Sequence, residues 1–404
     1  VWLSDGFSAE GEVRLVGARL GANLTLHGAV LDHPGGPALN LERISAGDVQ
    51  AAELTVRSGH VGFGRCQVAG SLDLSRSRLE GGDGPVLRLD NAAIGSLVLR
   101  ALRASGEIIV RTARIEGRVL LERAEIRNPG GIALRMSRTE VGADVFCHGM
   151  TVEGTLKLAR AVVGRHLDLE DAHLTAPGDV AVDARGLTAG QLSLLPGGPI
   201  QGTVVLRHAR IGVLRDDPAR WPERAALGGM TYDALEPALA ARDRLRWLTR
   251  DPDGFQPQTY EQLAAHYVAT GRHADGRVVM LARERHQRRT ETALGRTWGL
   301  LQDVTTGYGY QPWRAVLWLV VLLAAGTVVY GNSPPRPLKP GEAPHFNAFA
   351  YTLDLLLPIV DLGQERALNP AGAHQWFAYA LVAAGWVLAT TIAAGAARVI
   401  GRRG

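Results

Sequence analysis

Residues 113–158 read ARIEGRVLLERAEIRNPGGIALRMSRTEVGADVFCHGMTVEGTLKL, and short apolar-x-apolar pairs begin within them at Val119, Leu134, Val145 and Leu156. Most of these pairs have a glycine just ahead of them. Alternation of apolar and polar residues over three or four positions is typical of a strand with one buried face, and helical periodicity is absent. The stretch therefore predicts a series of short β-strands.

The same signature recurs through the first half of the chain at regular intervals. The steps are 10 to 12 residues long, but every fourth step is lengthened to 15, so that the pattern repeats after 47 or 48 residues. The longer steps contain turn residues, as in Pro34–Pro37 and Pro129–Gly131. The first apolar residues of the signature are Val13, Leu24, Leu39, Val49, Val61, Leu72, Leu87, Leu97, Ile108, Val119, Leu134, Val145, Leu156, Leu167, Val182, Leu192 and Val204.

Strands this short cannot bury a core alone, but stacked turns pair each strand with its equivalents one turn before and after. The repeat predicts a mainly β fold, with a parallel β-helix (solenoid) over residues 1–215. Eight or nine turns at about 4.8 Å each give a length of about 40 Å. Glycine, at 49 of 404 residues, suits the tight corners. The alternative, a β-sandwich of short strands, does not explain steps that repeat in register.

The overall composition excludes several classes of protein. The net charge is only +4, and no run of five like charges occurs, so a nucleic-acid partner is not expected. The two cysteines, Cys66 and Cys147, lie far apart and outside any CxxC pattern, which predicts neither a disulfide framework nor a zinc site.

Residues 216–312 are expected to form a capping loop and a small α-helical connector. The repeat stops near Arg215, and Trp221-Pro222 and Gly228-Gly229 predict a loop that covers the last turn. Helices are expected at 242–249, 259–269 and 273–289.

Residues 313–404 are predicted to be a membrane domain with two transmembrane helices. Uncharged, apolar runs place the spans at about 315–333 and 376–397, each close to the ~20 residues that cross a bilayer. The intervening segment 346–362 is apolar but contains Pro358, so it predicts an interfacial or re-entrant helix.

Arginines are more frequent outside the two spans than in the loop between them. The positive-inside rule then predicts that both termini and the solenoid face the cytoplasm at the plasma (inner) membrane. No signal peptide is recognised ahead of the solenoid.

Three sets of residues are candidate functional positions. A basic cluster on a juxtamembrane helix is expected to contact anionic lipid, with a solvated positive-inside face as the alternative. A small-residue face in the second span predicts close packing with the first span or with a second copy, hence a homo-oligomer. Two acids in the connecting segment are the residues to test in a pore. The basic cluster is Arg283, Arg285, Arg288 and Arg289. The small-residue face is Gly385, Ala389, Ala393 and Ala397, and the two acids are Asp354 and Asp361.

No phosphate-binding loop, GxSxG or HExxH motif occurs, so no catalytic, cofactor or metal residue is predicted. The leading hypothesis is a membrane-anchored cytoplasmic scaffold that binds a protein partner on the solenoid. The order span, half-helix, span gives the alternative of a two-span channel or transport component with a pore loop.

Three stretches carry a resemblance to a known family: YEQLA at Tyr260–Ala264, TGYGYQPWRA at Thr306–Ala315, and the segment Tyr351–Leu362. They resemble uncharacterised bacterial, actinobacterial-type membrane proteins with a β-helical, pentapeptide-repeat-like front half, often labelled membrane-associated oxidoreductase. The resemblance implies a redox enzyme as a second alternative, although no cofactor motif maps onto residues of this chain.

Overall fold

The structure is a computed structural model that describes the chain except residues 5, 291–312, 340–344, 358–360 and 401–404. The side chains of residues 82, 83, 288–290 and 391–400 are also outside the description. The chain forms two compact units, Val1–Val279 and Met280–Gly404.

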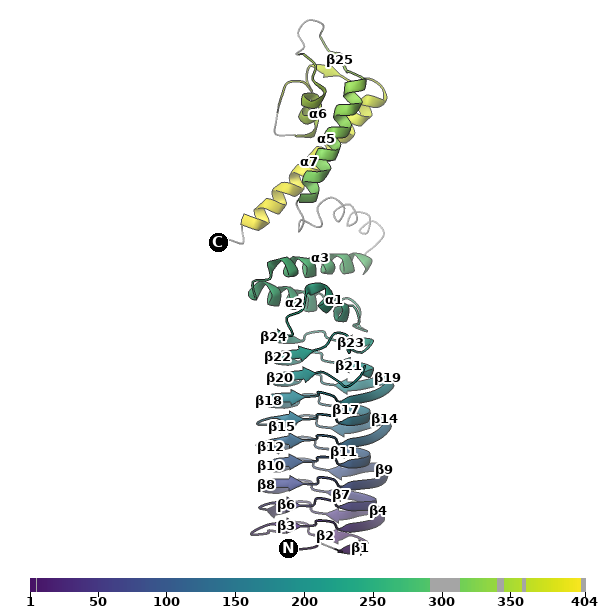
Figure 1. The fold of residues 1–404 in the computed structure, drawn as a ribbon, viewed down its shortest axis with the longest axis vertical. Helices are drawn as coiled ribbons and strands as arrows, with labels where there is room; N and C mark the ends of the chain where they lie inside the picture. The colour runs from purple at the N-terminus through teal and green to yellow at the C-terminus, as the bar shows by residue number, and fades with distance from the viewer. Residues whose placement is uncertain (5, 291–312, 340–344, 358–360, 401–404) are drawn as a thin grey trace. The chain divides into compact units, whose positions relative to one another are not determined.

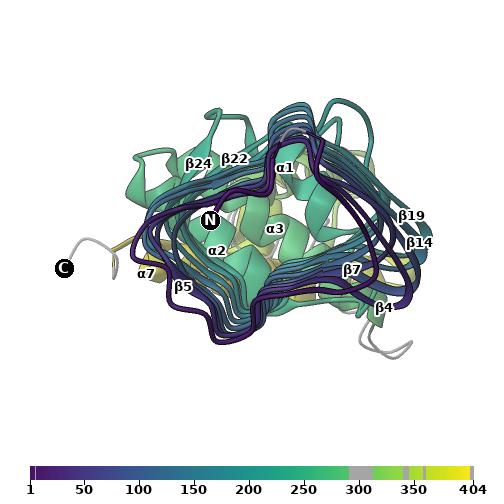
Figure 2. The same ribbon diagram turned by 90° about the horizontal axis from the view of Figure 1, so that it is seen from below.

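In the first unit, two sheets wind together into a parallel β-solenoid of about ten turns (Figure 1). Strands of neighbouring turns pair in parallel, for example Leu72 with Leu97 and Leu97 with Val119. Viewed along the solenoid axis, successive turns superimpose (Figure 2). The predicted fold class is confirmed for this part of the chain, and at about 4.8 Å per turn the solenoid is about 50 Å long.

One sheet has 11 strands and the other 13. The 11-stranded sheet contains β1 (Ser8–Glu10), β2 (Val13–Arg14), β4 (Val30–Asn40), β7 (Thr55–Gly62), β9 (Arg78–Arg88), β11 (Arg103–Ile109), β14 (Glu125–Arg135), β17 (Thr151–Lys157), β19 (His173–Asp183), β21 (Gln201–Val205) and β23 (Arg224–Ala226). The 13-stranded sheet contains β3 (Leu24–Thr25), β5 (Ser45–Ala46), β6 (Val49–Gln50), β8 (Gln67–Asp73), β10 (Ala93–Val98), β12 (Arg114–Ile115), β13 (Val119–Leu120), β15 (Glu140–Val141), β16 (Val145–Phe146), β18 (Val162–Asp168), β20 (Thr188–Leu194), β22 (Arg210–Asp216) and β24 (Thr231–Glu236).

The first residue of every apolar pair lies in one of these strands. The solenoid, however, is longer than expected. It includes β1 before the first pair and β22, β23 and β24 after the last one. The solenoid therefore ends at Glu236 and not near residue 215. The last turns escape the pattern because Asp216 takes the place of the second aliphatic residue of the pair that begins at Leu214, and because Tyr232 is buried in register with Ile211.

The interior consists of stacked aliphatic columns. Leu72, Leu97 and Val119 follow one another in register and are fully buried. Cys66 and Cys147 are buried in the same interior, and burial raises the pKa of the Cys66 thiol to about 12. Both cysteines are therefore packing residues, because only an accessible thiolate is reactive.

The glycine excess has a structural cause in the 13-stranded sheet. A Cβ built on Gly95 would lie 2.4 Å from the carbonyl oxygen of Gly70 in the preceding turn, and one on Gly212 would lie 2.4 Å from that of Gly190. In these turns the backbone thus approaches that of the preceding turn too closely for a side chain. The column consists of Gly47, Gly70, Gly95, Gly117, Gly142, Gly164, Gly190 and Gly212.

The three helices predicted for the connector form, as α1 (Ala241–Leu248), α2 (Pro257–Ala269) and α3 (His273–Thr290). Residues 291–312 of the predicted connector lie outside the described residues. The fully buried Arg244 of α1 donates to Asp216 of β22 at 2.6 Å, and the indole of Trp221 donates to the other oxygen of Asp216 at 2.7 Å. The Trp221 and Trp247 rings lie 5.0 Å apart. These contacts attach α1 to the last turns of the solenoid.

The second unit contains α5 (Trp313–Asn332), β25 (Arg336–Pro337), α6 (Ala348–Leu356), β26 (Leu368–Asn369) and α7 (Ala373–Ile400). Its core joins all three helices, since Tyr330 of α5, Tyr351 and Leu355 of α6, and Leu381 of α7 are buried together. Tyr330 and Tyr351 meet edge to face at 4.9 Å.

Among the described residues, α5 is the one helix long and apolar enough to be a candidate membrane span. The prediction of two candidate spans is therefore corrected to one. The second predicted span, 376–397, lies in α7, which opens with the polar His374 and Gln375. Its last ten residues, 391–400, lie outside the described side chains.

Candidate functional site

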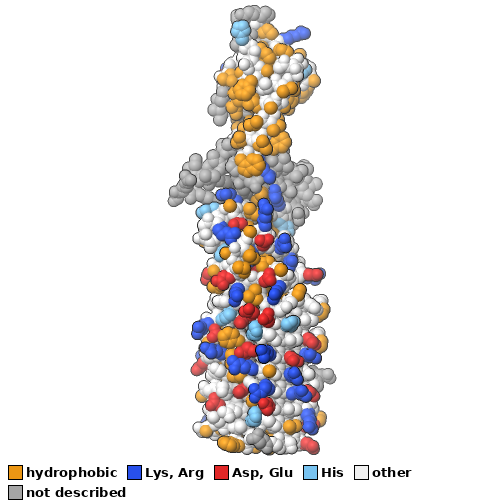
Figure 3. All heavy atoms as spheres, viewed as in Figure 1, with side chains coloured by type: hydrophobic (Ala, Val, Ile, Leu, Met, Phe, Trp, Pro, Cys, Tyr) orange, Lys and Arg blue, Asp and Glu red, His pale blue; other side chains and the backbone are white. Residues whose placement is uncertain are grey.

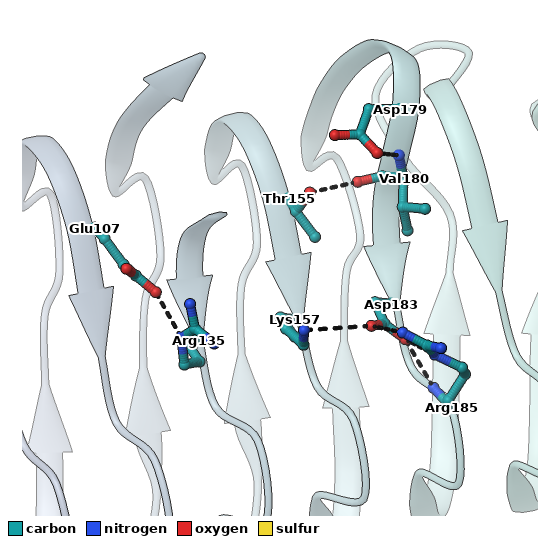
Figure 4. A network of polar contacts seen from close by, with 8 residues as sticks. All are labelled: Glu107, Arg135, Thr155, Lys157, Asp179, Val180, Asp183 and Arg185. Carbon is teal, nitrogen blue, oxygen red and sulfur yellow. Dashed lines mark hydrogen bonds and ion pairs between the residues drawn. The ribbon is translucent and has the colours of Figure 1, made fainter. Parts of the chain in front are cut away.

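A shallow pocket opens on the outside of the 11-stranded sheet. The long arcs at Pro129–Gly131 and Thr175–Asp179 flank the short turn at Glu153-Gly154, and the pocket between them measures about 170 Å³. Gly154 is required there, because a Cβ would lie 2.4 Å from the Asn128 carbonyl oxygen. Figure 4 shows the hydrogen bond of 2.7 Å that crosses this region, from the Thr155 hydroxyl to the Val180 carbonyl oxygen. The pocket is smaller than ordinary ligand sites of ≈ 300–1,000 Å³.

The solenoid also has two corners where one sheet passes into the other, and their charges differ. We call the passage from the 11-stranded to the 13-stranded sheet the basic corner. It comprises the last residue of each strand and the final two residues of the tight turn that follows. Its basic residues are Arg14, Arg43, Arg65, Arg88, Arg111, Arg135, Arg138, Lys157, Arg160, Arg185 and Arg207, and its acidic residues are Glu42, Asp90 and Asp183.

Some of these charges are paired within the corner. Figure 4 shows the nearly buried carboxylate of Asp183, which receives two bonds of 2.8 Å from Arg185 and lies 3.9 Å from Lys157. Burial alone would raise the pKa of Asp183, but the hydrogen bonds and positive charge of Arg185, helped by Lys157, lower it below its usual range. Arg135 is bonded to Glu107 at 2.6 Å.

Four arginines of the basic corner are exposed and have positive φ, between 56° and 58°. No described residue forms an ion pair or a side-chain hydrogen bond with any of them. They are Arg43, Arg65, Arg138 and Arg160.

The passage from the 13-stranded to the 11-stranded sheet is the acidic corner. Over the seven turns from β3 to β18, the equivalent positions have the basic residues Arg76, Arg100 and Arg123 and the acidic residues Glu53, Asp73, Glu122, Asp168, Glu170 and Asp171. Arg76 pairs with Glu53 at 2.8 Å and Arg100 with Glu122 at 3.1 Å. The net negative charge is therefore concentrated at Asp168, Glu170 and Asp171.

A serine and a histidine on the outer face of the 13-stranded sheet lie close enough for nucleophilic catalysis. The Ser193 hydroxyl is 2.7 Å from His166 Nε2 and also 3.4 Å from Gln191 Nε2. Ser193 is fully buried, however. A nucleophile must reach its substrate, so this pair has a structural role.

The predicted basic cluster lies on α3, where Arg283 approaches Glu284 at 3.6 Å and Arg285 is exposed. The side chains of Arg288 and Arg289 lie outside the described residues. Contact of this cluster with lipid stays a prediction.

The predicted small-residue face begins at a close helix contact. A Cβ on Gly385 of α7 would lie 2.1 Å from the Leu356 carbonyl oxygen of α6. A Cβ on Gly326 of α5 would similarly lie 2.2 Å from Thr352 Cγ2 of α6. Gly385 thus packs against the helix between the predicted spans. Ala389 is half-buried, and the side chains of Ala393 and Ala397 lie outside the description.

The two candidate acids have different environments. Asp354 of α6 is buried, and its carboxylate accepts hydrogen bonds from the backbone N–H groups of Leu362 at 2.7 Å, Gln364 at 2.9 Å and Glu365 at 2.8 Å. It therefore anchors the segment that follows α6. Asp361 is exposed and pairs with Arg366 at 3.2 Å.

The opposite charges of the two corners are not among the sequence-based expectations. The signal was present in the alternation of the apolar pairs, because successive pairs belong to different sheets and hence to different corners.

Comparison with models of protein families, with characterised proteins and with solved structures finds no match to this chain. The resemblance to actinobacterial-type membrane proteins therefore stays a prediction.

Proposed function

We propose that this protein is a membrane-anchored scaffold, with α5 in the inner membrane and the solenoid presenting its outer surface to a partner in the cytoplasm. The observation that carries the proposal is the exposure of α5. Only 17% of its most apolar 18-residue window is buried. The core helix of a soluble protein would bury most of such a window.

The exposed apolar side chains extend around much of α5 and reach α7. Val320, Val328 and Trp386 are each more than half exposed. Figure 3 shows such hydrophobic side chains gathered on the helical unit, whereas acidic and basic side chains intermingle on the visible face of the solenoid. An apolar surface of this kind is costly in water and favourable in lipid.

A binding role suits the solenoid better than catalysis. Its interior is filled by aliphatic side chains. The pocket between the arcs is small, and the serine of the Ser193–His166 pair is fully buried. What the solenoid offers is a long outer surface patterned by charge, which is the part that repeat proteins use for binding.

Membrane extraction and truncation test the anchor. The full chain should resist extraction from membranes by alkaline carbonate and should require detergent. A truncation that ends at Gln311, before α5, should be soluble and keep a β-rich circular dichroism spectrum. A full chain released by carbonate would contradict the membrane anchor. An insoluble or helical fragment would contradict the assignment of the β-solenoid to the soluble part and of α5 to the membrane.

The pore-loop alternative is favoured by one observation, the position of α6. This nine-residue helix, about 14 Å long, packs against both Gly326 of α5 and Gly385 of α7. In this alternative Asp354 acts by holding the loop, since its carboxylate is already occupied by backbone donors. Conductance in planar bilayers that collapses in Asp354→Asn and persists in Asp361→Asn would support a pore, and electrical silence across ions and voltages would remove it.

A further inference from the structure

We infer that copies of this chain associate side by side, with the basic corner of one solenoid against the acidic corner of the next. This inference goes beyond the proposed function and does not depend on a bilayer. It rests on the complementary charge of two surfaces that belong to the same chain.

The charges of each corner are stacked at a constant spacing along the axis. At the basic corner, the Arg138 amide donates to the Ala159 carbonyl oxygen at 3.0 Å, and the Arg160 amide to that of Arg185 at 2.8 Å. At the acidic corner, the Asp171 amide donates to the Leu195 carbonyl oxygen at 2.9 Å. These bonds set both columns to the solenoid pitch of about 4.8 Å.

The pitch favours a second solenoid as the partner. Charges on one face of an α-helix recur about every 5.4 Å, and those on one face of an extended strand about every 6.6 Å. Either pattern drifts out of step with a column of 4.8 Å within a few turns. A second copy has the same pitch, so its turns stay in step with those of the first, and the basic residues of one copy can face the acidic residues near β18 of the next.

The two corners complement each other best near β18. Arg160 precedes this strand and Asp171 follows it, so the two residues lie within one turn of each other along the axis. Two solenoids that point the same way therefore bring Arg138 and Arg160 of one copy opposite Glu170 and Asp171 of the next.

These charges are available for a partner. Arg138 and Arg160 are exposed, and no described side chain pairs with them. The side chains of Glu170 and Asp171 are 42% and 58% exposed, and their ionic contacts, with Arg215 and His148, are both long at 3.9 Å.

The contact is heterologous, because each copy uses a different corner on each side. Such an interface produces a ring if the rotation between copies closes and an open row if it does not. It is also built from exposed charges, so salt should weaken it strongly.

The test is a charge-swap cycle in the full chain, purified in detergent and followed by sedimentation velocity. The wild type should form oligomers at low ionic strength and dissociate in about 0.5 M salt, where the Debye length is only a few ångströms. Arg138→Asp/Arg160→Asp and Glu170→Arg/Asp171→Arg should each weaken association about tenfold or more. The chain with all four changes should recover it.

The substitutions suit the backbone of the corners. Asp is among the residues that tolerate positive φ, and arginine already occupies this conformation at Arg160, as it would at Asp171. Arg57→Glu/Arg78→Glu is the matched control. It makes the same change of charge on the exposed face of the 11-stranded sheet and should leave association unchanged. Circular dichroism confirms the fold of each variant.

A cysteine pair gives an independent measurement. With Arg160→Cys and Asp171→Cys in one chain, oxidation should link different copies into covalent oligomers. The two positions lie at opposite ends of β18, about 20 Å apart, which is too far for a disulfide within one chain. The native Cys66 and Cys147 are buried.

Three outcomes would overturn the inference. The wild type could be monomeric at low salt, or the oligomer could survive both reversals, as it would if assembly ran through α7. Alternatively, reversal of the basic corner alone could abolish association without rescue by the four-residue swap, which would assign that corner to a different anionic partner.

Discussion

The solenoid and the helical unit use the same residue type for close backbone contact, but in different ways. In the solenoid, Gly95 lies against the Gly70 carbonyl oxygen, and the same contact recurs along a column of glycines. In the helical unit, Gly385 meets the Leu356 carbonyl oxygen in a contact that belongs to one pair of helices. A contact that recurs at every turn produces a regular spacing of residues in the sequence. A contact made once, as in the helical unit or between α1 and the last turns of the solenoid, produces no such spacing.

The largest effect is expected at a contact made once, the buried ion pair of the cap. Arg244→Met should lower the free energy of unfolding by about 3–5 kcal/mol, because it leaves the carboxylate of Asp216 buried without its cation. Urea denaturation followed by tryptophan fluorescence measures this, since Trp221 and Trp247 report on the cap. Arg244→Met/Asp216→Leu should recover much of the loss, and a single variant as stable as the wild type would contradict the role of the pair.

A smaller effect is expected in the repeated glycine column. Gly95→Ala should cost about 1–3 kcal/mol, as overpacking does, because the new Cβ must displace the backbone of the preceding turn. Gly21→Ala is the matched control. Gly21 lies in the first turn next to Ala22, whose carbonyl oxygen accepts from Gly47, and a Cβ on Gly21 would meet nothing within 4 Å. Equal denaturation midpoints for the two variants would show that close stacking does not explain the column.

The helical unit should be sensitive at Asp354 and insensitive at Asp361. Asp354→Asn weakens the hydrogen bonds of three backbone amides, at a cost of about 1–2 kcal/mol, and should lower the midpoint of thermal unfolding in detergent. Asp361→Asn alters an exposed ion pair worth well under 1 kcal/mol. A larger shift for Asp361→Asn would reverse the roles assigned here to the two acids.

The smallest effect concerns acid stability at the basic corner. Because the pKa of Asp183 is lower in the folded chain than its usual value near 3.8, its contribution to stability is present above that pH. It is lost as the pH falls through the folded pKa. Asp183→Asn should therefore reduce the free energy of unfolding at neutral pH. It should also narrow the difference between the free energies of unfolding at pH 7 and at about pH 3. An unchanged pH dependence of the urea midpoint would exclude this contribution.

The sequence was a reliable guide wherever a local pattern repeats. The first residue of each apolar pair, from Val13 to Val204, lies in a strand because the pair must face the interior. Pro257–Ala269 and His273–Thr290 form helices close to the expected bounds. It was a poorer guide where the pattern becomes irregular. The turns after residue 215 continue the solenoid with the buried Tyr232 in β24, and the period alone does not show this.

The candidate site followed the same division. The sequence identifies Asp354 as an acid in the apolar connecting segment, but the partners of its carboxylate lie 8 to 11 residues later in an irregular segment. The sequence could not show which amides would reach it. Gly385 was assigned to helix packing, and the structure identifies α6 as the helix that packs there.

By itself, the sequence determined that this protein has a β-solenoid and an apolar helix suited to a bilayer, since period and hydropathy are local properties that add along the chain. Only the tertiary structure decided which charges share a corner, which glycines stack and which carboxylates are buried. Those properties depend on residues about one turn of the solenoid apart, such as Asp216 and Arg244. Winding the chain brings these residues together, and no local pattern records that proximity.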